Sequence, residues 1–112
     1  MFSLSTPYTK EEGAAIPVQF LNPNREVIFE TKGLLVTGSA DCLINTALAT
    51  QLSLGKSSII RIAVSDGATT IEHEVLFRAV DLQRNVILGM SFMQHFHLVF
   101  DGPNKLVTIT EP

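Results

Sequence analysis

Apolar and polar positions alternate along most of this chain in short runs. Seven runs predict β-strands, since β-branched residues with a period of two are typical of strands buried on one face. They cover residues 16–21, 26–31, 58–64, 69–80, 85–89, 97–101 and 105–110. A further apolar run, residues 33–36, ends at a loop of small and turn-forming residues.

Turn-forming residues separate these runs. Residues 22–25 (Asn-Pro-Asn-Arg), 65–68 (Ser-Asp-Gly-Ala) and 102–104 (Gly-Pro-Asn) each predict a turn. Proline fixes φ, Asn and Asp bond to nearby backbone, and glycine accepts a positive φ. Each turn therefore joins the strands on either side of it into a hairpin.

Helical signals are few. Residues 47–52 suit a short helix that Asn45 and Thr46 cap and Gly55 ends, and residues 91–96 suit one that Ser91 caps. Many short strands with so little helix predict an all-β barrel or sandwich. The 112 residues amount to a single domain, with residues 1–15 as an N-terminal arm or edge strand.

The amino-acid composition excludes several classes of protein. Hydrophobic residues make up 46% and charged residues 17%, which excludes disorder as the main state. The net charge of −3 argues against a nucleic-acid partner. Residues 1–10 do not resemble a signal peptide, and no apolar run is long enough for a membrane helix. Cys42 is the only cysteine, so an internal disulfide and a cysteine-based zinc site are excluded, and a reducing compartment such as the cytoplasm is expected.

Two segments together resemble the retropepsin-like aspartic protease family. Residues 33–44 (Gly-Leu-Leu-Val-Thr-Gly-Ser-Ala-Asp-Cys-Leu-Ile) lie where that family has an apolar run followed by Asp-Thr-Gly-Ser/Ala. Residues 85–93 (Asn-Val-Ile-Leu-Gly-Met-Ser-Phe-Met) lie where it has Ile-Leu-Gly before a short helix. Residues 64–70 match its flap hairpin, and residues 100–109 resemble its closing hairpin. The resemblance implies a closed β-barrel with a flap hairpin and one or two short helices.

One position departs from the family pattern. The Asp that precedes Thr-Gly in the family is Val36 here. Such enzymes cleave peptides with two carboxylates that share one proton, and in the short form each of two chains supplies one. The resemblance thus implies a homodimeric aspartic endopeptidase domain that takes a peptide or protein in its cleft and needs no cofactor or metal. Because Val36 has no ionisable group, we predict that this chain is catalytically inactive.

The resemblance also assigns the candidate site. Val36 holds the catalytic position, the Thr37 hydroxyl would bond to the partner's loop, and Gly38 would let backbone pass close to bound peptide. The expected substrate contacts are Ser39, Ala40, Asp41, Asp66, Gly67 and Ala68, the last three at the flap tip. For Asp41, a bond to its own backbone is an equal alternative, and for Ser39 a hydroxyl that braces the loop is favoured over a nucleophile.

Dimerisation would involve both ends of the chain. By the resemblance, residues 2–6 and 106–109 would join an intermolecular sheet, which would hide strand edges.

Three further residues carry weaker signals. His95 and His97 would share one face of a strand, as metal ligands do, although ordinary surface or half-buried histidines are favoured. Cys42 is expected to be a small buried apolar residue rather than a reactive thiol. No metal site is predicted.

The sequence leaves three interpretations open. The first is an active-site variant of a working aspartic protease. The second is a natural pseudoprotease that serves as a dimerisation or peptide-binding module. The third is an unrelated small β-barrel that binds a ligand or acts as an adaptor. Whether Val36 is natural or introduced is not decided by the sequence.

Overall fold

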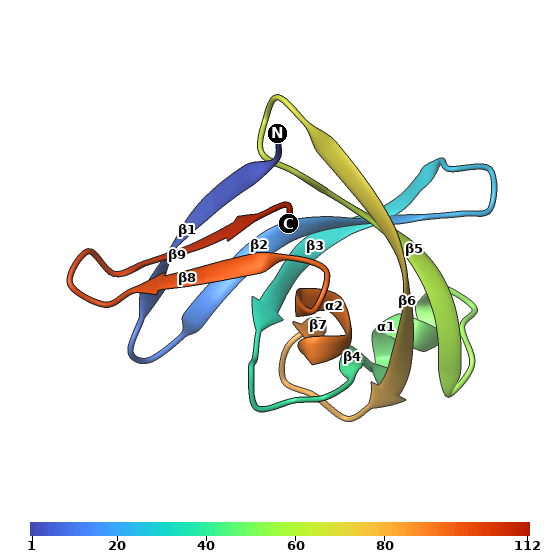
Figure 1. The fold of residues 1–112 in the computed structure, drawn as a ribbon. Helices are drawn as coiled ribbons and strands as arrows, with labels where there is room; N and C mark the ends of the chain where they lie inside the picture. The colour runs from blue at the N-terminus through green and yellow to red at the C-terminus, as the bar shows by residue number, and fades with distance from the viewer.

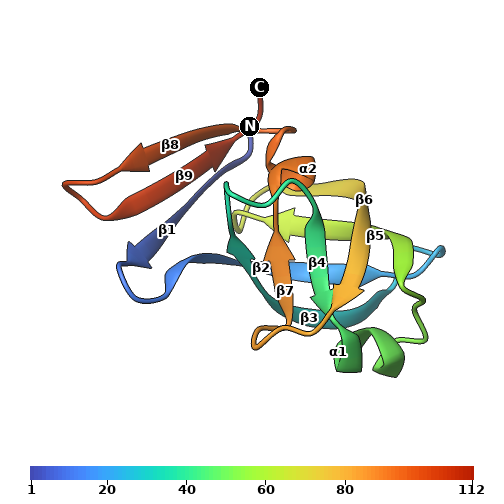
Figure 2. The same ribbon diagram turned by 90° about the horizontal axis from the view of Figure 1, so that it is seen from below.

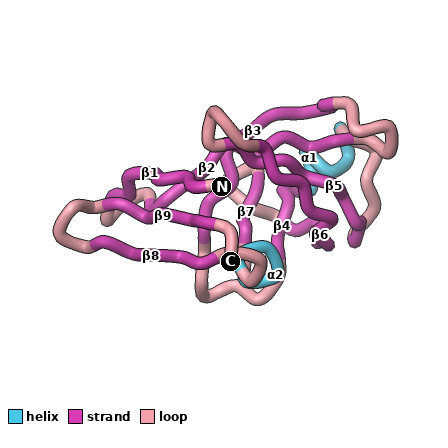
Figure 3. The backbone as a smooth tube through the Cα atoms, turned by 45° about the horizontal axis from the view of Figure 1, so that its top comes forward, coloured by secondary structure: helices cyan, strands magenta, loops and turns pink.

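A computed structural model describes all 112 residues and contains nine strands and two short helices. In chain order the elements are β1 (Ser3–Thr9), β2 (Gly13–Leu21), β3 (Val27–Leu35), β4 (Cys42–Asn45), α1 (Thr46–Gln51), β5 (Ser57–Ser65), β6 (Thr70–Val80), β7 (Val86–Leu88), α2 (Met90–Met93), β8 (His97–Asp101) and β9 (Leu106–Thr110). The predicted all-β class is confirmed, and Figure 3 shows how little of the backbone is helical.

Six of the strands close into a barrel (Figures 1 and 2). The order is β3-β7-β4-β6-β5-β2, and β2 pairs with β3 again to complete the circle. The β3–β7 and β4–β6 pairs are parallel, and the other pairs in the barrel are antiparallel. The barrel therefore threads β7 between β3 and β4, which are themselves joined by the loop of residues 36–41. This crossing positions the candidate site.

The remaining strands form an extension beside the barrel. β1 pairs with β9 from Ser3↔Thr110 to Pro7↔Leu106, and β9 pairs with β8. Figure 2 shows these three strands projecting from one side. Residues 2–6 and 106–109 thus pair within the chain, and the predicted sheet between two chains stays a prediction. Both strands already have their partners, so the free edge of the sheet belongs to β8.

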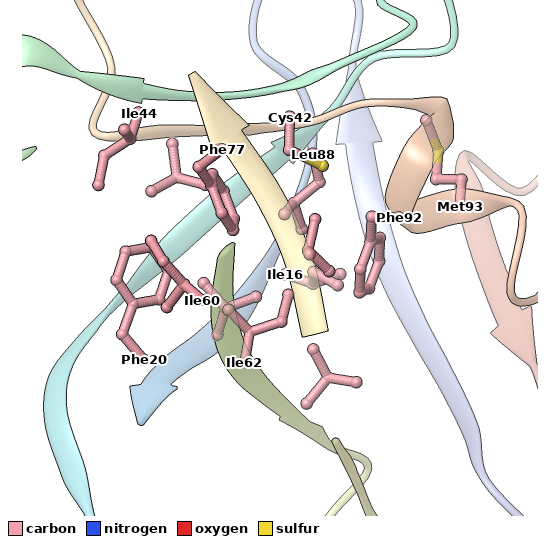
Figure 4. Close-up of a cluster of buried hydrophobic side chains, with 14 of the residues drawn as sticks. Ile16, Phe20, Cys42, Ile44, Ile60, Ile62, Phe77, Leu88, Phe92 and Met93 are labelled. Carbon is pink, nitrogen blue, oxygen red and sulfur yellow. The ribbon is translucent and has the colours of Figure 1, made fainter. Parts of the chain in front are cut away.

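The barrel is filled with large apolar side chains (Figure 4). Phe20 and Phe77 are fully buried, and their rings lie 5.4 Å apart. Alternation along the strands explains the core, because Ile16, Val18 and Phe20 on β2 share one face of their strand. No polar or charged side chain is buried.

The two helices follow the sequence signals unequally. The Asn45 side chain accepts hydrogen bonds from the N–H groups of Ala47 and Leu48, so the predicted cap of α1 is confirmed. For α2 the prediction is wrong, since Gly89 and not Ser91 takes the N-cap position, and no side chain caps the helix. Neither helix is long and apolar enough to cross a membrane.

Candidate functional site: the loop between β3 and β4

The loop of residues 36–41 is held at both ends by the segment that passes beneath it. The N–H of Val36 donates to Leu88 O at 3.1 Å. Beyond β7, the N–H of Met90 donates to Ser39 O at 2.8 Å and that of Ser91 to Ala40 O at 3.0 Å. Backbone groups alone make these bonds, so the shape of the loop does not depend on which side chain stands at position 36.

Two glycines permit the crossing. A Cβ at Gly89 would meet the carbonyl oxygens of Ser39 and Asp41, so only hydrogen fits there. A Cβ at Gly33 would lie 2.7 Å from a methyl group of Leu88. Glycine thus lets β7 and the start of α2 lie directly against the loop. Gly89 is the glycine of the Ile-Leu-Gly motif, which explains why the motif ends as it does.

The polar side chains of the loop are engaged with the protein itself. The Ser39 hydroxyl donates to Asp41 O at 2.7 Å, so it braces the loop. The Asp41 carboxylate accepts from Arg78 Nη1 at 2.8 Å and does not bond to its own backbone. Arg78 lies on β6, whose register places it opposite Leu43, just beyond the loop. Asp41, the only acid in the loop, is therefore paired with a cation.

Thr37 and Gly38 are the exposed residues at the bend of the loop. Thr37 lines an apolar cavity of about 280 Å³ between the barrel and the extension, together with Tyr8, Leu35, Met93 and Phe100. Its hydroxyl makes no hydrogen bond within the chain. A Cβ at Gly38 would meet nothing within 4 Å, so the chain itself gives no reason for a glycine there.

The other predicted site residues lie in the turn between β5 and β6. Residues 66–69 do form the turn of the β5–β6 hairpin, and Gly67 has a φ of 96°. The Asp66 carboxylate, however, accepts the N–H of Ser3 at 2.9 Å, which ties the turn to the start of β1.

The distance along β6 shows how far this turn is from the loop. The loop meets β6 near Phe77, which pairs with Cys42, whereas the turn begins before Thr70. The seven residue steps from Thr70 to Phe77 span roughly 20 Å along the strand. Whether Asp66, Gly67 and Ala68 contact substrate as the tip of a flap stays a prediction, since it concerns a cleft with bound peptide. The Asp-Gly signal identified a hairpin turn correctly, but it carried no information about which site the turn would face.

The turn has an electrostatic consequence of its own. Three backbone N–H groups, those of Ser3, Thr69 and Ala68, donate to the Asp66 carboxylate and lower its pKa to about 2. A carboxylate that accepts several N–H bonds is stabilised in its charged form. Asp66 therefore acts as a structural anion.

The histidines and the cysteine are not gathered into a metal site. His95 precedes β8 and stacks on His73, while His97 is the first, exposed residue of that strand. No group of three His, Cys, Asp or Glu side chains lies close enough to hold a metal ion. Cys42 is fully buried, as expected, and burial raises the pKa of its thiol.

Sequence reasoning did not identify Arg78 or the residues around the cavity beside Thr37. Arg78 is an isolated cation in an alternating strand, and nothing in the sequence links it to Asp41. Tyr8 and Phe100 come from opposite ends of the chain, yet their ring centroids lie 4.6 Å apart. They come together only because β9 pairs with β1 on one side and with β8 on the other.

Comparison with solved structures shows which known folds this architecture is similar to. No protein-family model and no curated protein matches the sequence. The chain is similar to a retropepsin-like aspartic protease from Rickettsia conorii, with a TM-score of 0.72 and 13% identity over 96% of this chain and 90% of that one. An aspartic proteinase from Irpex lacteus gives a TM-score of 0.62 and 18% identity over 99% of this chain, which spans 47% of that protein.

A third similar structure is the retroviral protease-like domain of Ddi1 from Leishmania major. It gives a TM-score of 0.52 and 12% identity over 85% of this chain and 86% of that domain. At such identities the likeness concerns the fold, and it agrees with the closed barrel and the loop crossing described above. The chain therefore adopts the retropepsin-like aspartic protease fold.

Proposed function

We propose that this chain is a retropepsin-like aspartic protease domain that works as a homodimer and, with Val36 in the catalytic position, does not cleave peptides. The observation that carries the proposal is the loop itself. Backbone bonds from Leu88, Met90 and Ser91 hold it in place, while its side chains offer no free carboxylate. The scaffold of the reaction is thus present and its acid–base group is missing.

The missing group cannot be replaced from within the loop. Peptide hydrolysis by this chemistry needs one carboxylate to activate water and a second, protonated one to polarise the carbonyl. Asp41 is the only acid available, and its carboxylate is 2.8 Å from Arg78 Nη1. A neighbouring cation favours the charged carboxylate and opposes proton sharing.

Two features support a second copy of the chain as the partner. The Thr37 hydroxyl is exposed beside an apolar cavity and has no partner within the chain. β8 ends the sheet with a free edge, and Val99 and Phe100 on it are 58% and 65% exposed. An exposed apolar edge strand favours pairing with another chain.

The decisive experiment is a paired cleavage assay of the chain and its Val36→Asp variant. Both are incubated with a mixed peptide library from about pH 4 to 7, where shared carboxylates titrate. Products are identified by mass spectrometry, with and without a pepsin-type inhibitor. We expect cleavage by the Asp variant alone, and the inhibitor should abolish it.

A Val36→Asn variant serves as the matched control, since it is nearly the same size as the Asp variant and cannot ionise. Cleavage by the unaltered chain would refute the proposed inactivity. If neither chain cleaves although both are folded dimers, the protease assignment fails and a binding role remains.

The second candidate function is a natural pseudoprotease that dimerises or binds peptides without cutting them. The exposed apolar residues of β8 favour it, because this surface can serve a partner regardless of position 36. Peptide binding by the unaltered chain, measured by calorimetry, would support it. The third interpretation, an unrelated small barrel, is disfavoured by the shared fold.

A further inference from the structure

Two histidines from distant parts of the chain stack on each other. The ring of His73, on β6, lies 4.3 Å from that of His95, in the bend between α2 and β8, with 12° between the ring planes. The edge of Phe96 meets the His73 ring at 5.4 Å. The three rings join the β5–β6 hairpin to the α2–β8 bend, two segments that Figure 2 shows close together.

The same cluster of rings also packs against Phe2, near the start of the chain. Phe2 is fully buried, and its ring lies 5.9 Å from that of Phe96. The N–H of Phe2 donates to Glu111 Oε1 at 2.6 Å. Phe96 thus touches both the stacked histidines and the first buried residue of the N-terminal segment. A movement of the stacked histidines would therefore displace Phe96 and, with it, the Phe2 side chain that packs on it.

The charged groups near the stack leave the imidazoles unpaired. Glu72 and Glu74 flank His73 on β6 but point to the opposite face, where they hold Arg61 at 3.5 Å and 2.7 Å. Glu111 lines the same hollow as both histidines, and its carboxylate is engaged by the Phe2 N–H.

The strand β5, the helix α2 and the β5–β6 turn bring no free counter-charge. β5 places Ile62 opposite His73, and α2 has no charged residue. Asp66, in the β5–β6 turn, is occupied by the N–H groups of Ser3, Ala68 and Thr69. The remaining charges near this end are those of the Met1 amino group and of the carboxyl group of Pro112, which lines the same hollow as the two histidines. No carboxylate hydrogen-bonds either imidazole.

Protonation therefore changes this contact from attraction to repulsion. Neutral imidazoles stack favourably, as aromatic rings do. Two imidazolium ions at this separation repel each other, and partial burial keeps water from screening them fully. Burial and the charge of His95 both lower the pKa of His73, which is the direction expected of a pair that resists double protonation.

We propose that the His73–His95 stack is an acid-sensitive latch. At neutral pH it holds β6 against the α2–β8 bend, with Phe2 seated on Phe96. When both imidazoles are protonated the contact opens, and β1 loses its seat while the barrel stays folded. Acid then frees the β9 edge that β1 covers, close to the free edge of β8.

Amide hydrogen exchange tests the latch, because the protection of the β1 amides directly measures whether β1 stays paired with β9. The N–H of Tyr8 donates to Lys105 O, and the N–H of Glu111 donates to Phe2 O. Hydrogen-bonded pairs alternate along an antiparallel ladder, so the N–H groups of Leu4 and Thr6 also point to β9. We expect their protection, corrected for intrinsic exchange, to fall at least tenfold between pH 7.5 and 5. Barrel amides such as that of Ile62 should keep theirs.

The variants His73→Phe and His95→Phe keep a ring in place and remove the charge. In both we expect the protection of β1 to stay constant over the same pH range. His97→Phe, at an exposed histidine outside the stack, should behave like the unaltered chain. An equal loss in all variants would overturn the proposal, since carboxylates would then cause it, and so would constant protection in the unaltered chain.

A second measurement covers the case in which a variant folds poorly. Titration of the His73 ring signals by NMR in the unaltered chain and in His97→Phe should show the lowered pKa of this ring. In His95→Gln, the pKa of His73 should rise. Independent titration of the two rings would refute the latch even without a stability measurement.

Discussion

The α-carbon of Gly89 lies against the backbone carbonyl of Asp41, with no room for a side chain between them. This contact joins the Ile-Leu-Gly segment to the loop, and backbone cannot move aside as a flexible side chain can. It makes the glycine a requirement of the fold rather than of a turn.

Gly89→Ala should therefore be severely destabilising. We expect a loss of about 3 kcal/mol or more in the free energy of unfolding, at the upper end for an overpacked site. Urea denaturation followed by circular dichroism measures it. Gly38→Ala is the matched control, because a methyl group there meets nothing within 4 Å. Equal stability of the two variants would mean that the crossing of loop and β7 is misplaced.

The Asp41–Arg78 ion pair should contribute little to stability. Its atoms are 2.8 Å apart, but the side chains are 46% and 54% exposed. Exposed pairs of this kind give about 0.2–1 kcal/mol in double-mutant cycles. A cycle of Asp41→Asn and Arg78→Gln, analysed by urea unfolding, measures the coupling. A value well above this range would show that the pair is shielded from water, for instance by a second copy of the chain.

Asp66 should make stability depend on acid pH. Its pKa is lowered to about 2 in the folded chain, mainly by the N–H of Ser3 and then by those of Thr69 and Ala68. A lowered carboxyl pKa stabilises the fold above its ordinary value of 3.8, and this contribution is lost as the pH falls toward 2.

We expect Asp66→Asn to flatten the fall in stability between pH 4 and pH 2.5, measured by thermal unfolding at each pH. Asp81→Asn, at an exposed acid that makes no hydrogen bond, should leave the fall unchanged. If both variants match the unaltered chain, the bonds from Ser3, Ala68 and Thr69 do not form in solution.

Self-association should depend on β8. Phe100 is 65% exposed on the free edge strand, and Phe100→Lys places a charge on that surface. We expect at least a tenfold weaker dimer by sedimentation equilibrium, since charged residues blunt exposed edges. Ile59→Lys is the matched control, since Ile59 is 70% exposed but lies on β5 of the barrel and not on β8. Equal weakening by both, or none by either, would exclude β8 as the dimer surface.

Much of the fold could be predicted from local patterns. Strands β2, β5 and β9 coincide with the alternating runs to within a few residues, because one face of each is buried and the period of two is therefore visible. The cap at Asn45 was predictable for a similar reason, since a side-chain cap is a local interaction. The prediction that Ser91 caps α2 was wrong, because the tight approach of Gly89 to the loop, a tertiary contact, decides where the helix begins.

The site was predictable only in part. The loop of residues 36–41 lies where the motif indicated, since the two halves of the motif meet in space at Gly89. The role predicted for Asp66 at the flap tip stays a prediction, because a turn signal fixes the hairpin but not the direction in which the hairpin leans. The bond from Ser3 to Asp66 sets that direction, and it joins residues 63 positions apart. Similarly, no local signal reveals whether β1 and β9 pair within a chain or between two.

The pairing of β1 with β9 also has a consequence for the order of folding. Ser3 faces Thr110, so almost the whole chain must be made before the first strand finds its partner. Until then β1 is held only by its short contact with β2 at Tyr8 and Thr9. Pairings between such distant residues form slowly, because the loop that joins them must close first. Strand β1 is therefore expected to be among the last strands to dock, and the barrel has time to assemble without it.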